Sequence, residues 1–184
     1  MTRLTLLSLC LLCLATPALA QDASASASAP DATAAPPISS ADAFKMFVDA
    51  CTDASGGDPT SYDRLNNGGW TPNETDETGP YNAVYSGYRD VDGLGEVDLW
   101  GSVQSFPTQR LGYCRVDFSD ANNILDFSAM NGLKGLSGTL QPGAAGNVYG
   151  VWETPDKKLL VIGDRSDGAV ELEFNLILGD KPTP

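Results

Sequence analysis

The chain of 184 residues contains no histidine. Histidine is the side chain that ordinarily titrates between pH 5 and 8, and it is a common base in catalytic dyads and a common metal ligand. Its absence excludes imidazole base catalysis and histidine-held metal sites. The sequence also lacks the Gly-x-Ser-x-Gly elbow, the phosphate-binding P-loop and the Ser-x-x-Lys motif. We therefore expect a protein that is not an enzyme.

Basic residues are scarce as well. The chain has 11 Lys and Arg against 24 Asp and Glu, for a net charge of −13. A surface of this sign repels nucleic acid and anionic lipid, so neither is expected as a partner. The same charge attracts basic proteins, and a basic protein or envelope component is the expected partner. Solubility alone is the alternative reason for the charge.

The first twenty residues have the pattern of an export signal. Residues 1–3 carry one positive charge, residues 4–14 are an apolar run too short to span a bilayer, and Ala18-Leu19-Ala20 matches a cleavage site. We expect residues 1–20 to be a signal peptide and the protein to be periplasmic or secreted. After its removal we expect no stable membrane insertion.

Only two of the four cysteines would remain in the exported chain, because Cys10 and Cys13 lie in the leader. The remaining pair, Cys51 and Cys114, would meet an oxidising compartment. An even number of cysteines there predicts one disulfide between them.

The rest of the chain predicts one domain between two polar ends. Residues 21–38 are rich in Ala, Ser and Pro and predict a disordered linker. Residues 39–180 carry the patterns of secondary structure, and residues 181–184 form a tail. Phe44, Phe47, Val48 and Cys51 follow the i, i+3, i+4, i+7 spacing of a helix that begins near Ser39.

Downstream, alternating segments predict strands, and residues 58–80 predict a long irregular segment. A second helix is expected from residue 119 or 120 to Gly132. The expected strands cover residues 81–91, 96–106, 113–118, 147–153, 158–164 and 170–178, and residues 136–140 are a candidate for a further short strand. Together these predict an α+β fold: two helices packed on a twisted, mainly antiparallel sheet of about six strands, with one disulfide.

Closely spaced carboxylates surround two glycines in residues 90–98. Such a segment can wrap a calcium ion, and the candidate ligands are Asp90, Asp92, Glu96 and Asp98. The fit to an EF-hand loop is poor, since Leu94 stands at a ligand position. The alternative is a hairpin turn that uses Asp-Gly, and we expect no cofactor other than this possible calcium.

Two pairs of carboxylates share a strand face. Glu171 and Glu173 form one pair, and Glu96 and Asp98 form the other. Paired carboxylates can act as acid and base in glycoside hydrolysis. Pairs of this kind also arise on any solvated face of an acidic protein, and this second reading is favoured.

Aromatic residues gather at the start of the domain. A possible binding surface consists of Trp70, Tyr81, Tyr85, Tyr88 and Trp100, with Tyr113 nearby. Aromatic rings beside acidic groups can recognise sugars, peptides or a basic protein. Cross-strand packing in the core is the alternative use of these rings.

One resemblance follows from the residues above. A leader, an Ala/Pro segment, the Phe44-x2-Phe47-x3-Cys51 helix and the strand around Cys114 resemble small uncharacterised periplasmic proteins of Gram-negative bacteria. That resemblance implies an exported α+β domain and implies no activity or site residue.

Taken together, these patterns predict an exported, non-catalytic binding module of the inhibitor or immunity type. A passive envelope component is the first alternative. A hydrolase dependent on carboxylates or on a divalent cation is the second.

Overall fold

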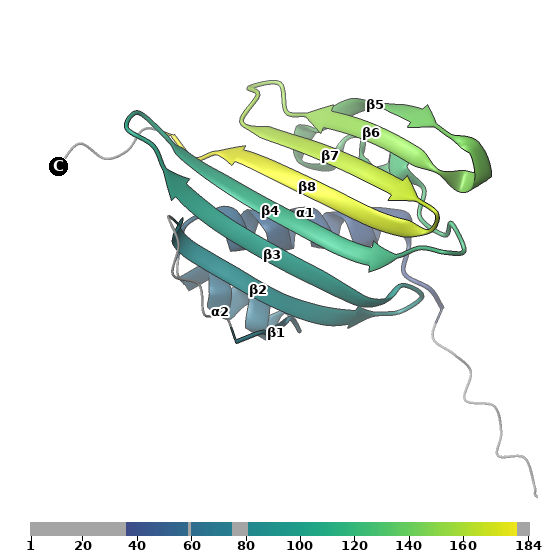
Figure 1. Cartoon of the computed structure of the whole chain (residues 1–184), viewed down its shortest axis with the longest axis horizontal. Helices are drawn as coiled ribbons and strands as arrows, with labels where there is room; N and C mark the ends of the chain where they lie inside the picture. Colours follow the sequence, from purple (N-terminus) through teal and green to yellow (C-terminus); the bar gives the residue numbers. More distant parts are fainter. Residues whose placement is uncertain (1–35, 59, 75–80, 180–184) are drawn as a thin grey trace, which may run out of the picture. The chain divides into compact units, whose positions relative to one another are not determined.

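The computed structural model describes residues 36–58, 60–74 and 81–179, and they form an α+β fold (Figure 1). The predicted signal peptide, the linker up to residue 35 and the tail at 181–184 lie outside the described residues. Among those described, no helix has the length and apolar character needed to cross a bilayer.

Within these ranges, eight antiparallel strands form one sheet in the order β1-β2-β3-β4-β8-β7-β6-β5. Their bounds are β1 Thr71–Pro72, β2 Tyr81–Val91, β3 Gly95–Ser105, β4 Arg110–Ser119, β5 Ser137–Pro142, β6 Val148–Glu153, β7 Leu159–Ser166 and β8 Ala169–Ile177. The antiparallel α+β prediction is confirmed, but the count of about six strands was too low. Two short strands at the edges of the sheet make up the difference. β1 has only two residues, and β5, which corresponds to the candidate strand at residues 136–140, is largely exposed and shows no clear alternation.

The sheet has two chemically different faces, which we call inner and outer. The inner face points toward the helices and carries the buried residues of alternating positions, such as Val97, Leu99, Val116, Leu172 and Phe174. The outer face carries the residues between them. In Figure 1 both helices lie behind the strands, so the outer face is the one seen in front.

Helix α1 (Ser40–Ser55) packs its predicted apolar face on the inner side of the sheet. Ser39 caps it, since its Oγ accepts the N–H of Asp42 at 3.2 Å. Phe44 and Phe47 are fully buried. The C-terminal end of α1 comes very close to the strands because Gly112 leaves room for it; a Cβ there would overlap the carbonyl oxygen of Ser55.

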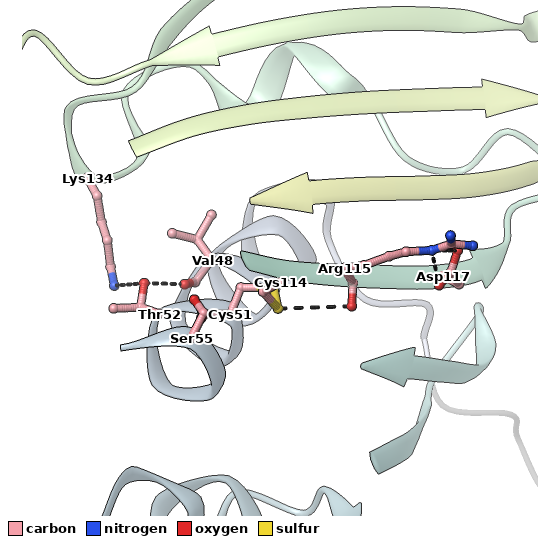
Figure 2. Close-up of a disulfide and its surroundings, with 8 residues drawn as sticks. All are labelled: Val48, Cys51, Thr52, Ser55, Cys114, Arg115, Asp117 and Lys134. Carbon is pink, nitrogen blue, oxygen red and sulfur yellow. Dashed lines mark hydrogen bonds and ion pairs between the residues drawn. A yellow bond between two sulfur atoms is a disulfide. The ribbon is translucent and has the colours of Figure 1, made fainter. Parts of the chain in front are cut away.

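The predicted disulfide is present and joins α1 to β4 (Figure 2). The Cα atoms of Cys51 and Cys114 are 5.3 Å apart, and both residues are fully buried. The bond therefore fastens the helix to a central strand of the sheet.

The second helix lies elsewhere than predicted. Helix α2 (Thr60–Asn67) occupies part of the segment that was expected to be irregular, and the carboxylate of Asp58 accepts the N–H of Thr60 at its start. The helix expected from residue 119 or 120 to Gly132 was wrong. That stretch holds only the short 3₁₀ turn η1 (Phe127–Met130), because the carboxylate of Asp120 accepts the N–H groups of Ile124 and Leu125 in the loop that follows it, instead of capping a helix.

Candidate functional site

A groove of about 580 Å³ lies on the outer face near one end of the central strands. Its apolar lining comes from three aromatic and four aliphatic residues on β2, β3, β4, β7 and β8. They are Tyr81, Trp100, Tyr113, Leu111, Leu160, Leu176 and Ile177. The sheet face thus carries an aromatic hollow on the side away from both helices.

Three of these rings form a continuous chain across neighbouring strands. The centroids of Tyr81 and Trp100 are 5.7 Å apart with planes at 82°, and those of Trp100 and Tyr113 are 5.7 Å apart at 59°. The first contact is edge-on and the second is tilted, and together they hold the rings in place. Tyr81 is 36% exposed, so its ring remains open to a ligand.

The remaining lining of the groove is polar and mostly uncharged. It includes Ser102, Gln104, Gln109, Asn175 and the basic Lys157, and the backbone of Gly112 completes the lining. Hydroxyl and amide groups can orient a ligand by hydrogen bonds, while the rings supply contact area.

One hydrogen bond ties the groove to the carboxylates beside it. The hydroxyl of Tyr113 donates to Oε1 of Glu173 at 2.9 Å. Partial burial, reinforced by the negative charge of Glu173, raises the pKa of Tyr113 above its ordinary value. The phenol therefore stays protonated at neutral pH and remains a donor.

Beyond the groove, four carboxylates stand in line across four adjacent strands; we call them the acidic row. Asp98 on β3 is paired with Asp117 on β4, Asp117 with Glu171 on β8, and Glu171 with Asp164 on β7. Like charges placed directly opposite each other destabilise a sheet. The row is therefore a feature that sheet packing alone does not favour.

One arginine partly compensates the acidic row. Arg115 lies 2.7 Å from Asp117 and 3.1 Å from Glu171. Burial raises the pKa of Glu171, and the neighbouring Asp117 and Glu173 add to that rise against the effect of Arg115. The electrostatic potential at the row thus favours an added positive charge.

The structure divides the predicted aromatic surface between the two sides of the sheet. Tyr81 and Trp100 line the groove, and Tyr88 lies opposite Asp98 at the end of the acidic row. Trp70 and Tyr85 are buried in the core instead, at 4% and 5% exposure. Tyr85 donates its hydroxyl proton to Asn66 and packs on the inner side.

The predicted calcium ligands lie on the β2–β3 hairpin. Asp90 is paired with Glu96, and Asp98 follows on the same face of β3. Asp92 is in the turn, where Gly93 has a φ of +87°, as the Asp-Gly turn reading expects. In the described part of the chain, no group of three or more His, Cys, Asp or Glu side chains is placed to hold a metal ion. Calcium at these residues stays a prediction.

The two predicted carboxylate pairs lie on the outer face. Glu171 belongs to the acidic row, Glu173 stands between the row and the groove, and Glu96 and Asp98 lie on β3. The structure does not test the catalytic alternative for either pair, and solvated surface carboxylates stay the prediction. The sequence reasoning missed Asp117 and Asp164, since only the strand register brings them beside Asp98 and Glu171.

No protein-family model, curated protein or solved structure matches this chain. The resemblance to small periplasmic proteins therefore stays a prediction, and the site is interpreted from its own geometry.

Proposed function

We propose that this protein is an exported, non-catalytic binding module of the inhibitor or immunity type, and that it captures a basic protein on its outer face. The observation that carries this proposal is the aromatic groove beside the acidic row. Aromatic side chains are enriched where proteins bind each other, and opposite charge steers the partner to the surface.

Two features support export. The predicted leader directs the chain out of the cytoplasm, and the buried disulfide suits an oxidising compartment. The full chain carries a net charge of −13, and the exported domain, which loses Arg3 with the leader, is more negative still; it would meet basic envelope or secreted proteins there.

The test is a binding measurement with the basic proteins of the native cell envelope, enriched by cation exchange. The protein, expressed with its own leader, is passed with them over a size-exclusion column at ~0.05 M and ~0.5 M salt. We expect a complex that weakens at high salt and that Trp100→Ala disrupts. Asp63→Ala, on α2, changes the protein away from the outer face and serves as the control. Absence of any complex with the unaltered protein, or a complex indifferent to Trp100→Ala, would contradict the proposal.

A further inference from the structure

The groove and the acidic row lie on the same strands in a fixed order. Along β4, Leu111 and Tyr113 line the groove, Arg115 follows, and Asp117 belongs to the row. Tyr113 and Asp117 are four residues apart, which is about 13 Å along an antiparallel strand. Strand β4 therefore fixes the distance between an apolar site, the groove, and an anionic site, the acidic row.

We propose that the outer face binds an extended peptide segment of its basic partner, with an apolar side chain in the groove and lysines or arginines on the acidic row. This inference rests on the proposed function and adds the kind of segment that is recognised. An extended chain advances about 3.3 Å per residue. The anchor and the first basic residue would thus be about four residues apart.

Two carboxylates of the row are available for such a partner. Within the described part of the chain, Asp98 and Asp164 form no salt bridge, whereas Asp117 and Glu171 already share Arg115. Both available carboxylates are exposed and lie at opposite ends of the row. Neighbouring strands are ~4.8 Å apart, so the row spans roughly 14 Å, a length that two or three basic side chains can cover.

Charge complementarity favours a basic peptide segment over a second copy of the chain as the ligand of the outer face. Two copies would bring acidic rows together in chains that each carry a net charge of −13. Like-charge contact of that kind disfavours association. A neutral oligosaccharide could stack on the rings but would make no use of the row, so it serves as the competing ligand in the test.

The experiment is calorimetric titration with three synthetic peptides. The first is Trp-Ser-Ser-Ser-Lys-Lys-Lys, the second replaces its Trp by Ser, and the third replaces its lysines by glutamates. We expect the first to bind at least ~10-fold more tightly than either of the others, because each lacks one of the two contacts. Titrations with calcium and with a chelator separate this effect from any calcium binding on the β2–β3 hairpin.

Variants of the protein assign the two contacts. Trp100→Ala is expected to weaken the first peptide about 10-fold and to leave the weak binding of the Trp-free peptide unchanged. The double variant Asp98→Asn, Asp164→Asn should weaken all lysine peptides and flatten their salt dependence. Asp63→Asn removes one carboxylate from the exposed side of α2, away from the outer face, and should leave the binding of all three peptides unchanged. Urea unfolding of each variant checks that it is folded.

The outcomes distinguish this inference from the proposed function. Equal binding of the first two peptides, or binding of a neutral chito-oligosaccharide in place of the peptides, would overturn the peptide proposal. If the envelope proteins still formed a salt-sensitive, Trp100-dependent complex, the proposed function would stand without it. If neither the complex with the envelope proteins nor the binding of the first peptide were detected, the proposed function and the peptide inference would both be overturned.

Discussion

The guanidinium of Arg165 and the carboxylate of Asp120 form a buried ion pair, with Nη1 and Oδ2 2.6 Å apart. Their side chains are 10% and 0% exposed. Arg165 also donates to the carbonyl oxygens of Leu125 and Gly146 and lies over the ring of Phe127. This one pair therefore fastens the long connection between β4 and β5 to strand β7.

Removing the charge of Asp120 should strongly destabilise the fold. Asp120→Asn leaves the buried guanidinium of Arg165 without a counter-ion, and loss of one partner of a buried pair costs about 3–5 kcal/mol. The measurement is the free energy of unfolding in urea. The exposed pair of Arg64 and Asp53 provides the control, since Arg64→Ala should cost about 1 kcal/mol or less. Similar losses for the two variants would refute the structural role of the buried pair.

The disulfide should contribute a large part of the stability. It closes a loop between residues 63 apart in sequence, and removal of a native disulfide typically costs about 2–5 kcal/mol. Cys51→Ala with Cys114→Ala should therefore lower the urea midpoint markedly. Because both cysteines are fully buried, a reductant should act on the native protein only as fast as the structure opens. Two free thiols in protein from its native cell, found by intact mass, would contradict this account.

The close approach of α1 to β4 depends on Gly112. A Cβ at this position meets the backbone carbonyl of Ser55, which cannot rotate away, so Gly112→Ala should cost about 1–3 kcal/mol. Gly163→Ala is the matched control on the inner face. Its nearest neighbours are side-chain atoms of Leu172 and Trp152 at 3.0 and 3.1 Å, which can adjust. Urea unfolding should rank Gly112→Ala as the more damaging change, and the reverse order would contradict the packing described.

The elements that the sequence predicted well are those whose pattern is local. Helix α1 and the central strands repeat buried positions at a regular spacing, so their periodicity is visible in the chain itself. Helix α2 was missed because it has eight residues and buries only Ser61 and Leu65. The stretch from residue 119 has helical spacing of its apolar residues, but Asp120 binds Arg165, 45 residues away, and that contact overrides the local preference.

The candidate site was predictable only in part, because it depends on strand register. Tyr81 and Tyr85 are four residues apart and would share a strand face if β2 were regular. A shift in register between Tyr81 and Ala83 places Tyr81 on the outer face while Tyr85 is buried on the inner one. The acidic row likewise depends on the pairing of β4 with β8, two strands that are far apart in sequence, so no local pattern reveals it.

The stability of the protein should rise on mild acidification. The pKa of Glu171 is raised above 4.5 in the folded state, so the folded protein binds this proton more tightly than the unfolded chain does. The resulting stabilisation is fully present below pH 4.5 and is lost as the pH rises through the raised pKa. Asp126 and Asp156 act in the opposite sense. Hydrogen bonds hold the pKa values of both below 3.8, so their contribution is lost as the pH falls further.

The urea midpoint measured against pH should therefore have its maximum on the acidic side of neutrality. Glu171→Gln should remove the rise between neutral pH and 4.5 while leaving the loss at lower pH. Since the Glu171 side chain is 40% exposed, the effect should stay within ~1 kcal/mol. A profile for Glu171→Gln that coincides with that of the unaltered protein would contradict the prediction.

The acidic row should make the fold less stable than it could be. Asp98→Asn with Asp164→Asn removes the two carboxylates of the row that have no basic partner among the residues the structure describes, and each of them faces another acid across the strands. Relief of this repulsion should raise the free energy of unfolding by about 0.2–1 kcal/mol for each pair. The same variant is expected to lose affinity for the basic partner. A more stable protein that binds less well would mean that the row is present for binding, because a purely structural role predicts the opposite change in stability.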